Sequence, residues 1–191
     1  RPGQIDNLTD EVVIVKKFED YFTKTCCNLT TDGSQRLKDE YETKRAIYCG
    51  LPFDEELLFD VVLVDRAVKS LVHGKAAGLD GLTAEHLQHC HPALISILNK
   101  FFNLLIKFNY VPKGFGTSYT VPLPKNSYSV ASKSLSVEDF RGISISAVIS
   151  KVFEKCILDR YQRFFETSDS QFGFKKGLSC SHAIFCVKIP L

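Results

Sequence analysis

The chain has 191 residues, of which 45% are hydrophobic and 24% are charged, a composition typical of a folded globular protein. No apolar run reaches the length of a membrane-spanning helix, and no signal-peptide pattern opens the sequence, which argues against membrane and secreted proteins. The net charge is only +2, but residues 1–73 carry −4 and residues 74–191 carry +6, so the second part favours a polyanionic partner, unless its charges only solvate the surface.

The amino-acid composition also bears on whether the chain is part of a longer protein and on its cellular compartment. It contains no Met and begins with Arg1, so we expect an interior or processed piece of a longer protein. Seven cysteines are an odd number, and Cys156 falls on the apolar face of a predicted helix. Both features favour reduced thiols in a nuclear or cytoplasmic compartment.

The first 59 residues predict little regular structure beyond one helix. That helix runs from Asp10 to about Cys26, because apolar residues recur at helical spacing: Ile14, Phe18, Tyr21 and Phe22. Residues 28–53 are polar and contain several turn-forming residues. We interpret them as a linker with some helix across 34–47.

Helices and a glycine-rich turn are predicted next. A helix follows the acidic residues 54–56 and ends at Gly74, which suits a C-cap. The turn at 75–81 reads KAAGLDG. A short helix at 83–90 precedes a helix at 92–109 that is apolar nearly all round, which indicates deep burial or a partner surface.

Two strands and an amphipathic helix are predicted in the middle of the basic part. Residues 118–124 and 140–145 are separated by a polar, Ser-rich loop, which predicts a β-hairpin. Lys125 and Arg141 fall at matching ends of these strands, where an ammonium and a guanidinium together suit a polyphosphate. As an alternative, they are ordinary charges at the rim of a hairpin. A helix is predicted at 147–165, a turn at 171–177 and a last helix at 179–188.

Histidines and cysteines occur close together in two places and raise the question of a zinc site. One group is His86, His89, Cys90 and His91, and the other is Cys180, His182 and Cys186. A closed zinc site needs four converging ligands, whereas a helix would spread these side chains around its surface. We therefore predict no metal site and interpret both groups as parts of packed helices.

Four segments in order carry a resemblance to a known family. They read GKAAGLDGLTAEHL, VPLPKN, FRGISISAVISKVFE followed by DRY, and SQFGFKKGLSC. Together they resemble the fingers region of reverse transcriptases from non-LTR (long interspersed element) retrotransposons, over residues 60–187. The resemblance implies an α+β fold, in which a helical or linker region at 1–59 precedes a partial reverse transcriptase domain at 60–191 with the fingers and the edge of the palm.

The resemblance also implies roles for individual residues. Lys125 and Arg141 match the family's lysine and arginine that contact the triphosphate of the incoming nucleotide. Matches to positions near the template or other nucleic acid are Lys75, Gly78, Asp80, Gly81, Lys151, Gln171, Phe172, Gly173, Phe174 and Lys175. The alternatives are a structural ion pair with Glu154 for Lys151 and core packing for Phe172 and Phe174. Where many relatives have Pro after the motif arginine, this chain has Gly142, which we expect to loosen the start of the strand.

Chemistry in this family requires residues that the chain does not contain. The intact parent would be an RNA-directed DNA polymerase, a nucleotidyltransferase that uses deoxynucleoside triphosphates, an RNA template, a DNA primer and Mg²⁺ held by palm carboxylates. The chain ends before the family's palm carboxylates, and the palm and thumb are missing. We therefore expect it to contact triphosphate and template without holding a metal or catalysing alone. A non-catalytic nucleic-acid-binding remnant and a decayed gene piece that does not fold are the alternatives.

Overall fold

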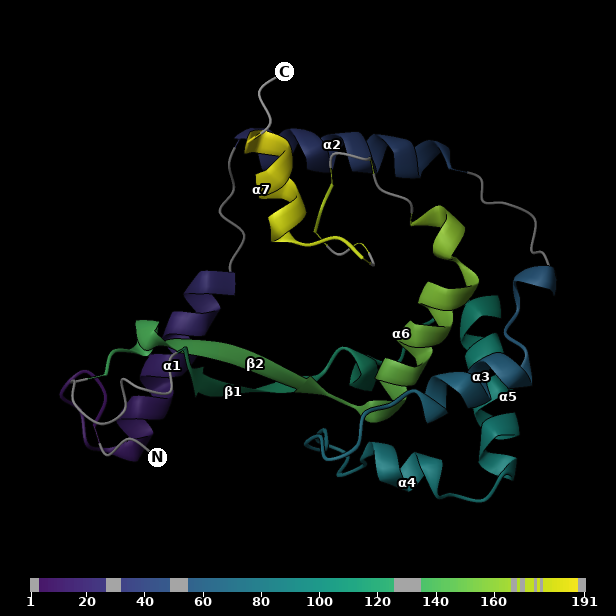
Figure 1. The fold of residues 1–191 in the computed structure, drawn as a ribbon, viewed down its shortest axis with the longest axis horizontal. Helices are drawn as coiled ribbons and strands as arrows, with labels where there is room; N and C mark the ends of the chain where they lie inside the picture. Colours follow the sequence, from purple (N-terminus) through teal and green to yellow (C-terminus); the bar gives the residue numbers. More distant parts are fainter. Residues whose placement is uncertain are drawn as a thin grey trace.

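The structure is a computed structural model and describes residues 4–26, 32–48, 55–125, 135–165, 168, 171–173, 175 and 177–188. It combines α-helices with an antiparallel two-stranded sheet (Figure 1), which is the α+β class predicted from the sequence. Short 3₁₀ turns lie at Glu55–Leu57, Lys113–Phe115, Val137–Asp139 and Gln162–Phe164.

Four helices form the main hydrophobic core: α3 (Val61–Lys69), α4 (Ala84–Gln88), α5 (Ala93–Lys107) and α6 (Val148–Arg160). Each contributes apolar side chains to one cluster, in which Val64, Phe102 and Val152 are fully buried. Because helices this short are marginal in water, their mutual burial is what stabilises them. The apolar periodicity predicted for α6 is confirmed, although the regular helix ends at Arg160 and continues as a 3₁₀ turn.

Charged side chains join the start of α3 to the end of α6. Asp60 accepts a hydrogen bond from the backbone N–H of Leu63 at 2.7 Å as the N-cap of α3, and its second oxygen pairs with Arg160 at 2.6 Å. The Leu63 hydrogen bond, followed by the Arg160 guanidinium, holds the pKa of Asp60 below its ordinary value. Arg66 of α3 pairs with Asp159 of α6 beside it. The two helices are therefore tied at their ends as well as through the core.

The predicted hairpin is confirmed almost residue for residue. β1 (Ser118–Pro124) and β2 (Phe140–Ser146) pair antiparallel, in a register that runs from Ser118 opposite Ser146 to Pro124 opposite Phe140. The base of the hairpin leads directly into α6. The hairpin therefore projects from the four-helix core.

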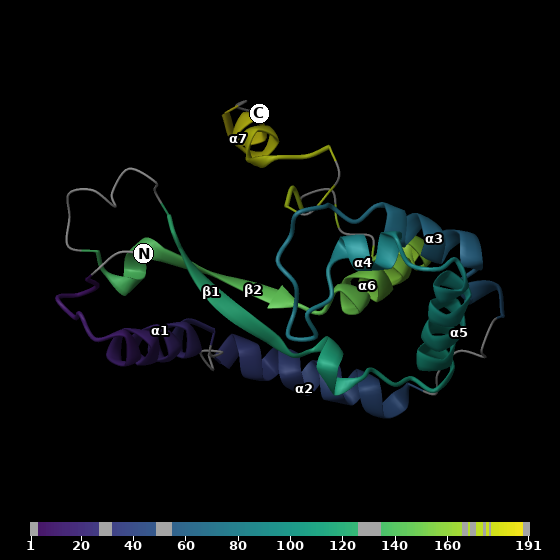
Figure 2. The ribbon, with the colours of Figure 1, turned by 90° about the horizontal axis from the view of Figure 1, so that it is seen from below.

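Helix α1 (Glu11–Cys26) lies along the hairpin and forms a second, smaller core with it. Phe18 packs with Phe140 at a ring-centroid distance of 5.1 Å. The other buried members of this core are Ile5, Leu135 and Val137. Figure 2 shows α1 beside the strands, with α3, α4, α5 and α6 gathered at the opposite end of the hairpin.

The region interpreted as a linker with some helix contains a full helix. α2 spans Asp32–Ile47, and the described side chains at 33–47 are all exposed. Local pairs support it, such as Lys44 with Glu40 at 2.6 Å and Gln35 with Asp39 at 2.9 Å. A polar helix of this kind is stabilised by neighbouring side chains rather than by an apolar face.

Helix α7 (Cys180–Lys188) closes the described chain. The hydroxyl of Ser179 shares a hydrogen bond with Nδ1 of His182 at 2.9 Å, at the predicted start of the helix. The same ring nitrogen accepts the backbone N–H of Ser179 at 3.1 Å. The imidazole of His182 is therefore hydrogen-bonded to Ser179 at the start of α7.

The structure corrects the expected end of α3 and, for the helix predicted at 92–109, excludes burial on all sides while leaving a partner surface open. α3 ends at Lys69, with Ser70 as its C-cap, rather than at Gly74. α5 is buried on one face only: Leu98, Phe102 and Leu105 are in the core. An exposed apolar row on α5 comprises Ile97, Phe101, Leu104 and Phe108. No helix in the described part of the chain is long and apolar enough to span a membrane.

The turn at 74–81 lies where the hairpin meets the helices. A Cβ on Gly78 would lie 2.9 Å from the Cα and backbone N of Ala147 and from the carbonyl oxygen of Ser146. The hydroxyl of Tyr119 in β1 donates to the carbonyl oxygen of Ala77 at 2.8 Å. The close approach of the backbone at Gly78 therefore requires a residue without a side chain.

We predict that Gly78→Ala lowers the free energy of unfolding by about 1–3 kcal/mol, because a methyl group would have to displace backbone at the junction of β2 and α6. Urea unfolding followed by circular dichroism measures the change. Gly114→Ala is the control, since a Cβ there meets nothing within 4 Å. Equal stability of the two variants would contradict the prediction.

Candidate nucleic-acid interface

Lys125 and Arg141 lie on one face of the hairpin. Arg141 is paired with Leu123 in the register, and the backbone N–H of Lys125 donates to the carbonyl oxygen of Asp139 at 2.8 Å, which extends the ladder by one residue. Directly paired residues project to the same side of a sheet, as do alternate residues along a strand. The two cations and Leu123 therefore share a face, and all three side chains are exposed.

The surroundings of the two cations include a backbone contact of Lys125 and two exposed aliphatic side chains. The Lys125 ammonium donates to the carbonyl oxygen of Glu138 at 2.6 Å, within its own hairpin. Exposed aliphatic side chains lie beside the cations on the same face, with Leu123 at 48% and Ile143 at 43% exposure. This face combines positive charge with a shallow apolar surface, which sequence reasoning did not anticipate. Alternation along β1 was the signal that could have revealed it.

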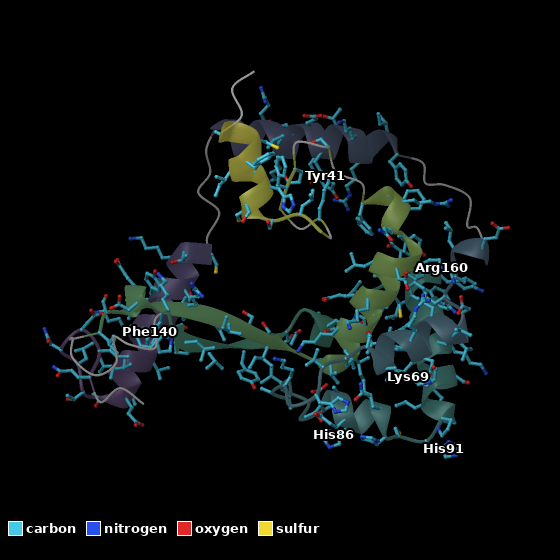
Figure 3. The ribbon with its side chains drawn as sticks, viewed as in Figure 1. Tyr41, Lys69, His86, His91, Phe140 and Arg160 are labelled. Carbon is cyan, nitrogen blue, oxygen red and sulfur yellow. The ribbon has the colours of Figure 1, made fainter. Side chains whose placement is uncertain are left out.

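The opposite face of the hairpin is covered by α1. Phe140, labelled in Figure 3, lies where the hairpin meets this helix. Gly142 pairs with Pro122 inside the ladder, and a Cβ on it would come within 3.1 Å of the Phe22 ring. β2 is continuous through Gly142, and the missing side chain makes room for Phe22. That Gly142 loosens the start of the strand stays a prediction.

The turn at 74–81 contains four of the residues matched to template contacts. Asp80 accepts the backbone N–H of Leu82 at 3.1 Å, and the N–H of Gly81 donates to Gly78 at 3.1 Å. Gly81 has a φ of +71°, a conformation that favours glycine. Asp80 and the two glycines thus shape the turn itself, and Lys75 is left as its exposed cation.

Glu85 fixes the beginning of this turn to α4. Its carboxylate accepts the backbone N–H of Gly74 at 2.6 Å. That hydrogen bond, together with backbone and Thr83 hydrogen bonds near the start of α4, lowers the pKa of Glu85 to about 2. The carboxylate is therefore charged throughout the physiological range.

Lys75 and Lys151 border a common pocket between the turn and α6. The pocket has a volume of about 340 Å³. Its lining is mainly aliphatic, including Leu71, Leu82 and Val148, and a third lysine, Lys155, lies at its side. The Lys155 ammonium donates to the hydroxyl and carbonyl oxygens of Ser70 at 2.7 and 3.0 Å. The structure thus brings together two of the lysines matched to nucleic-acid contacts.

The described residues 171–173 and 175 lie apart from the hairpin in both Figures 1 and 2. Gln171 donates from its amide to the carbonyl oxygen of Gly173 at 3.2 Å, and Lys175 donates to Ser168 at 2.7 Å. Phe172 is half-buried, and Phe174 lies outside the described residues. The structure therefore does not bring this segment together with the cation pair.

The clustered histidines are engaged with backbone near the helix starts. Nδ1 of His86 accepts the N–H of Thr83 at 3.0 Å, and Nδ1 of His91 accepts the N–H of Ala93 at 3.1 Å. Figure 3 shows the two side chains apart, near α4 and the start of α5. Within the described ranges, no group of three or more His, Cys, Asp or Glu side chains is arranged to hold a metal ion.

We predict that the stability difference between the wild-type chain and Glu85→Gln depends on pH. The folded-state pKa lies below the ordinary value, so the charged carboxylate stabilises the fold above about pH 5, and this contribution is lost between about pH 5 and pH 2. Thermal melts at pH 7, 5, 3.5 and 2 measure it. Glu154→Gln, at an exposed position of α6, is the control for loss of charge. A stability difference between the wild-type chain and Glu85→Gln that persists at pH 2 would contradict the prediction.

No family model matches the chain. A Drosophila melanogaster protein described as "Probable RNA-directed DNA polymerase from transposon BS" is 26% identical over 154 residues, which cover 78% of this chain and 16% of that protein. The chain thus spans about one sixth of the length of this relative. Its sequence supports an origin shared with a transposon RNA-directed DNA polymerase.

Proposed function

We propose that the chain is the fingers part of an RNA-directed DNA polymerase from a non-LTR retrotransposon, and that Lys125 and Arg141 contact the triphosphate of the incoming nucleotide. The observation that carries this proposal is the register of the hairpin, in which both cations share one exposed face. The similarity to a transposon polymerase supports it.

The chemistry of the two side chains suits a triphosphate. The planar guanidinium of Arg141 can donate two parallel hydrogen bonds to phosphate oxygens, while the Lys125 ammonium acts as a compact point charge. To reach a phosphate, Lys125 must exchange its contact with the Glu138 carbonyl oxygen for the anion. Both groups would neutralise phosphate charge and orient the nucleotide for in-line attack.

Metal chemistry in this proposal belongs to other parts of a longer protein. Two-metal polymerases bind Mg²⁺ through converging carboxylates, and the described residues offer no such group. The described residues therefore do not fit a Mg²⁺ site, and we assign no catalytic step to them. That longer protein would supply the palm and the thumb, and its nucleic-acid partners would be an RNA template and a DNA primer.

Template contacts are the second part of the proposal. The pocket bordered by Lys75 and Lys151 has a mainly aliphatic lining that also includes Lys155 and Glu154. Its lysines can neutralise the phosphates of a single strand. Gly78, Asp80 and Gly81 would act by fixing the turn that presents Lys75. Gln171, Phe172, Gly173, Phe174 and Lys175 are proposed to contact nucleic acid from the segment before α7.

We predict that Arg141→Ala weakens binding of a deoxynucleoside triphosphate by about tenfold or more, because hydrogen bonds to charged groups contribute about 1.5–3 kcal/mol. Arg141→Lys should lose less, since it keeps the charge but not the fork. NMR titration of the 191-residue chain at fixed ionic strength measures the affinity. Arg36→Ala, an exposed arginine of α2, is the matched control.

The same titration separates the proposal from a non-catalytic nucleic-acid-binding remnant. If the chain binds RNA but the wild type and Arg141→Ala have the same affinity for the triphosphate, the triphosphate role of Arg141 is wrong. A cooperative thermal transition of the wild-type chain would count against a decayed piece that does not fold.

We predict that Lys75→Ala and Lys151→Ala each weaken binding of single-stranded RNA and reduce the slope of log affinity against log salt by roughly 0.7. The reason is that each ammonium group that neutralises an RNA phosphate releases a counterion that was bound to the RNA. Fluorescence anisotropy with a labelled oligonucleotide at several salt concentrations measures the slope. Lys100→Ala, at an exposed position of α5, should leave the slope unchanged, and an equal effect of all three variants would contradict a site at the pocket.

A further inference from the structure

We propose that residues 5–22, upstream of the polymerase-like segments, are a positioning element for the cation pair on the hairpin. The inference rests on the proposed triphosphate role of Lys125 and Arg141. We call this element the N-terminal brace: the turn at residues 5–8 and the part of α1 up to Phe22.

The brace covers the hairpin directly behind the two cations. Phe18 is 7% exposed and meets the Phe140 ring edge to face, with centroids 5.1 Å apart. Phe140 is the residue before Arg141 in β2, and Gly142, on which the Phe22 ring lies, is the residue after it. The backbone on both sides of Arg141 is thus held from the back face.

The turn at 5–8 fixes the return strand from its leading end. The backbone N–H of Asp6 donates to the carbonyl oxygen of Leu135 at 2.7 Å, and the Asp6 carboxylate accepts the N–H of Val137 at 3.3 Å. The Lys17 ammonium lies 2.9 Å from the same carboxylate and, through this hydrogen bond, lowers its pKa. Asp6 thereby links α1 to the segment that leads into β2.

The brace acts at the end of the hairpin that the helical core does not reach. The base is held by Gly78, by the Tyr119 hydroxyl and by the connection to α6. Lys125 and Arg141 lie at the far end. A two-stranded ribbon is marginally stable by itself, so the distance between the two cations depends on what covers their back face. Only a fixed distance lets both contact one triphosphate at little entropic cost.

The first experiment measures the hairpin without any nucleotide. The amide N–H of Lys125 bonds to Asp139, so its hydrogen-exchange protection reports whether the far end is closed. We expect Phe18→Ala to reduce this protection about tenfold or more while the amides of α5 keep theirs. Val15→Ala, on an exposed position of the same helix, is the control. Unchanged protection at Lys125 would overturn the inference.

The second experiment tests whether the brace acts through the cations. In a double-mutant cycle, Phe18→Ala should weaken triphosphate binding several-fold, and Arg141→Ala should cost less in the Phe18→Ala background than in the wild type. Phe18→Leu, which keeps most of the apolar volume, should restore most of the affinity. Additive effects would mean that α1 only stabilises the fold, and would overturn a positioning role.

The two experiments together distinguish a failure of the inference from a failure of the proposed function. If Phe18→Ala fails to fold, Phe22→Leu replaces it in both experiments, because Phe22 is only half-buried. If the wild-type chain binds no triphosphate, the proposed function is wrong, and the N-terminal brace has no role in triphosphate binding either. The exchange data then still decide whether the brace orders the far end of the hairpin.

Discussion

The close approach of Gly78 to the junction of β2 and α6 is the contact on which the arrangement of the other parts depends. The backbone of the turn lies against Ser146 and Ala147 with no room for a Cβ. The hairpin, the turn and the first residues of α6 meet at this point, and Tyr119 secures β1 to the same turn. The direction in which the hairpin leaves the helices is thus set by a backbone contact, which allows far less variation than contacts between side chains.

Two separate hydrophobic clusters follow from this arrangement. The larger one joins α3, α4, α5 and α6, and the smaller one joins α1 to the hairpin. The hairpin connects the two clusters, since its base leads into α6 and its far end is covered by α1. Local stability should therefore differ along the strands, because the number of buried apolar side chains that support them differs.

The sequence predicted the elements whose signals are local. Alternation and turn residues located β1 and β2 almost to the residue, and the apolar spacing of α6 identified its buried face. α2 was underestimated because its exposed residues show no apolar face, and its support comes from charge and amide pairs such as Lys44 with Glu40. The contact between Phe22 and Gly142 could not be predicted, since it joins residues 120 positions apart whose meeting depends on the tertiary fold. The motif order singled out Lys125 and Arg141 as candidate residues, whereas the pocket that Lys75 and Lys151 both border could be found only from the structure.

The pairing of Asp60 with Arg160 has a consequence for synthesis of the chain. The two residues are 100 positions apart, and the same carboxylate caps α3. During translation α3 leaves the ribosome long before α6, and its apolar face has no α6 to pack on until then. Contacts of such large sequence separation form slowly because the intervening loop must first be closed. The four-helix core therefore cannot form until α6 has been synthesised, and until then the apolar face of α3 is a surface to which a chaperone can bind.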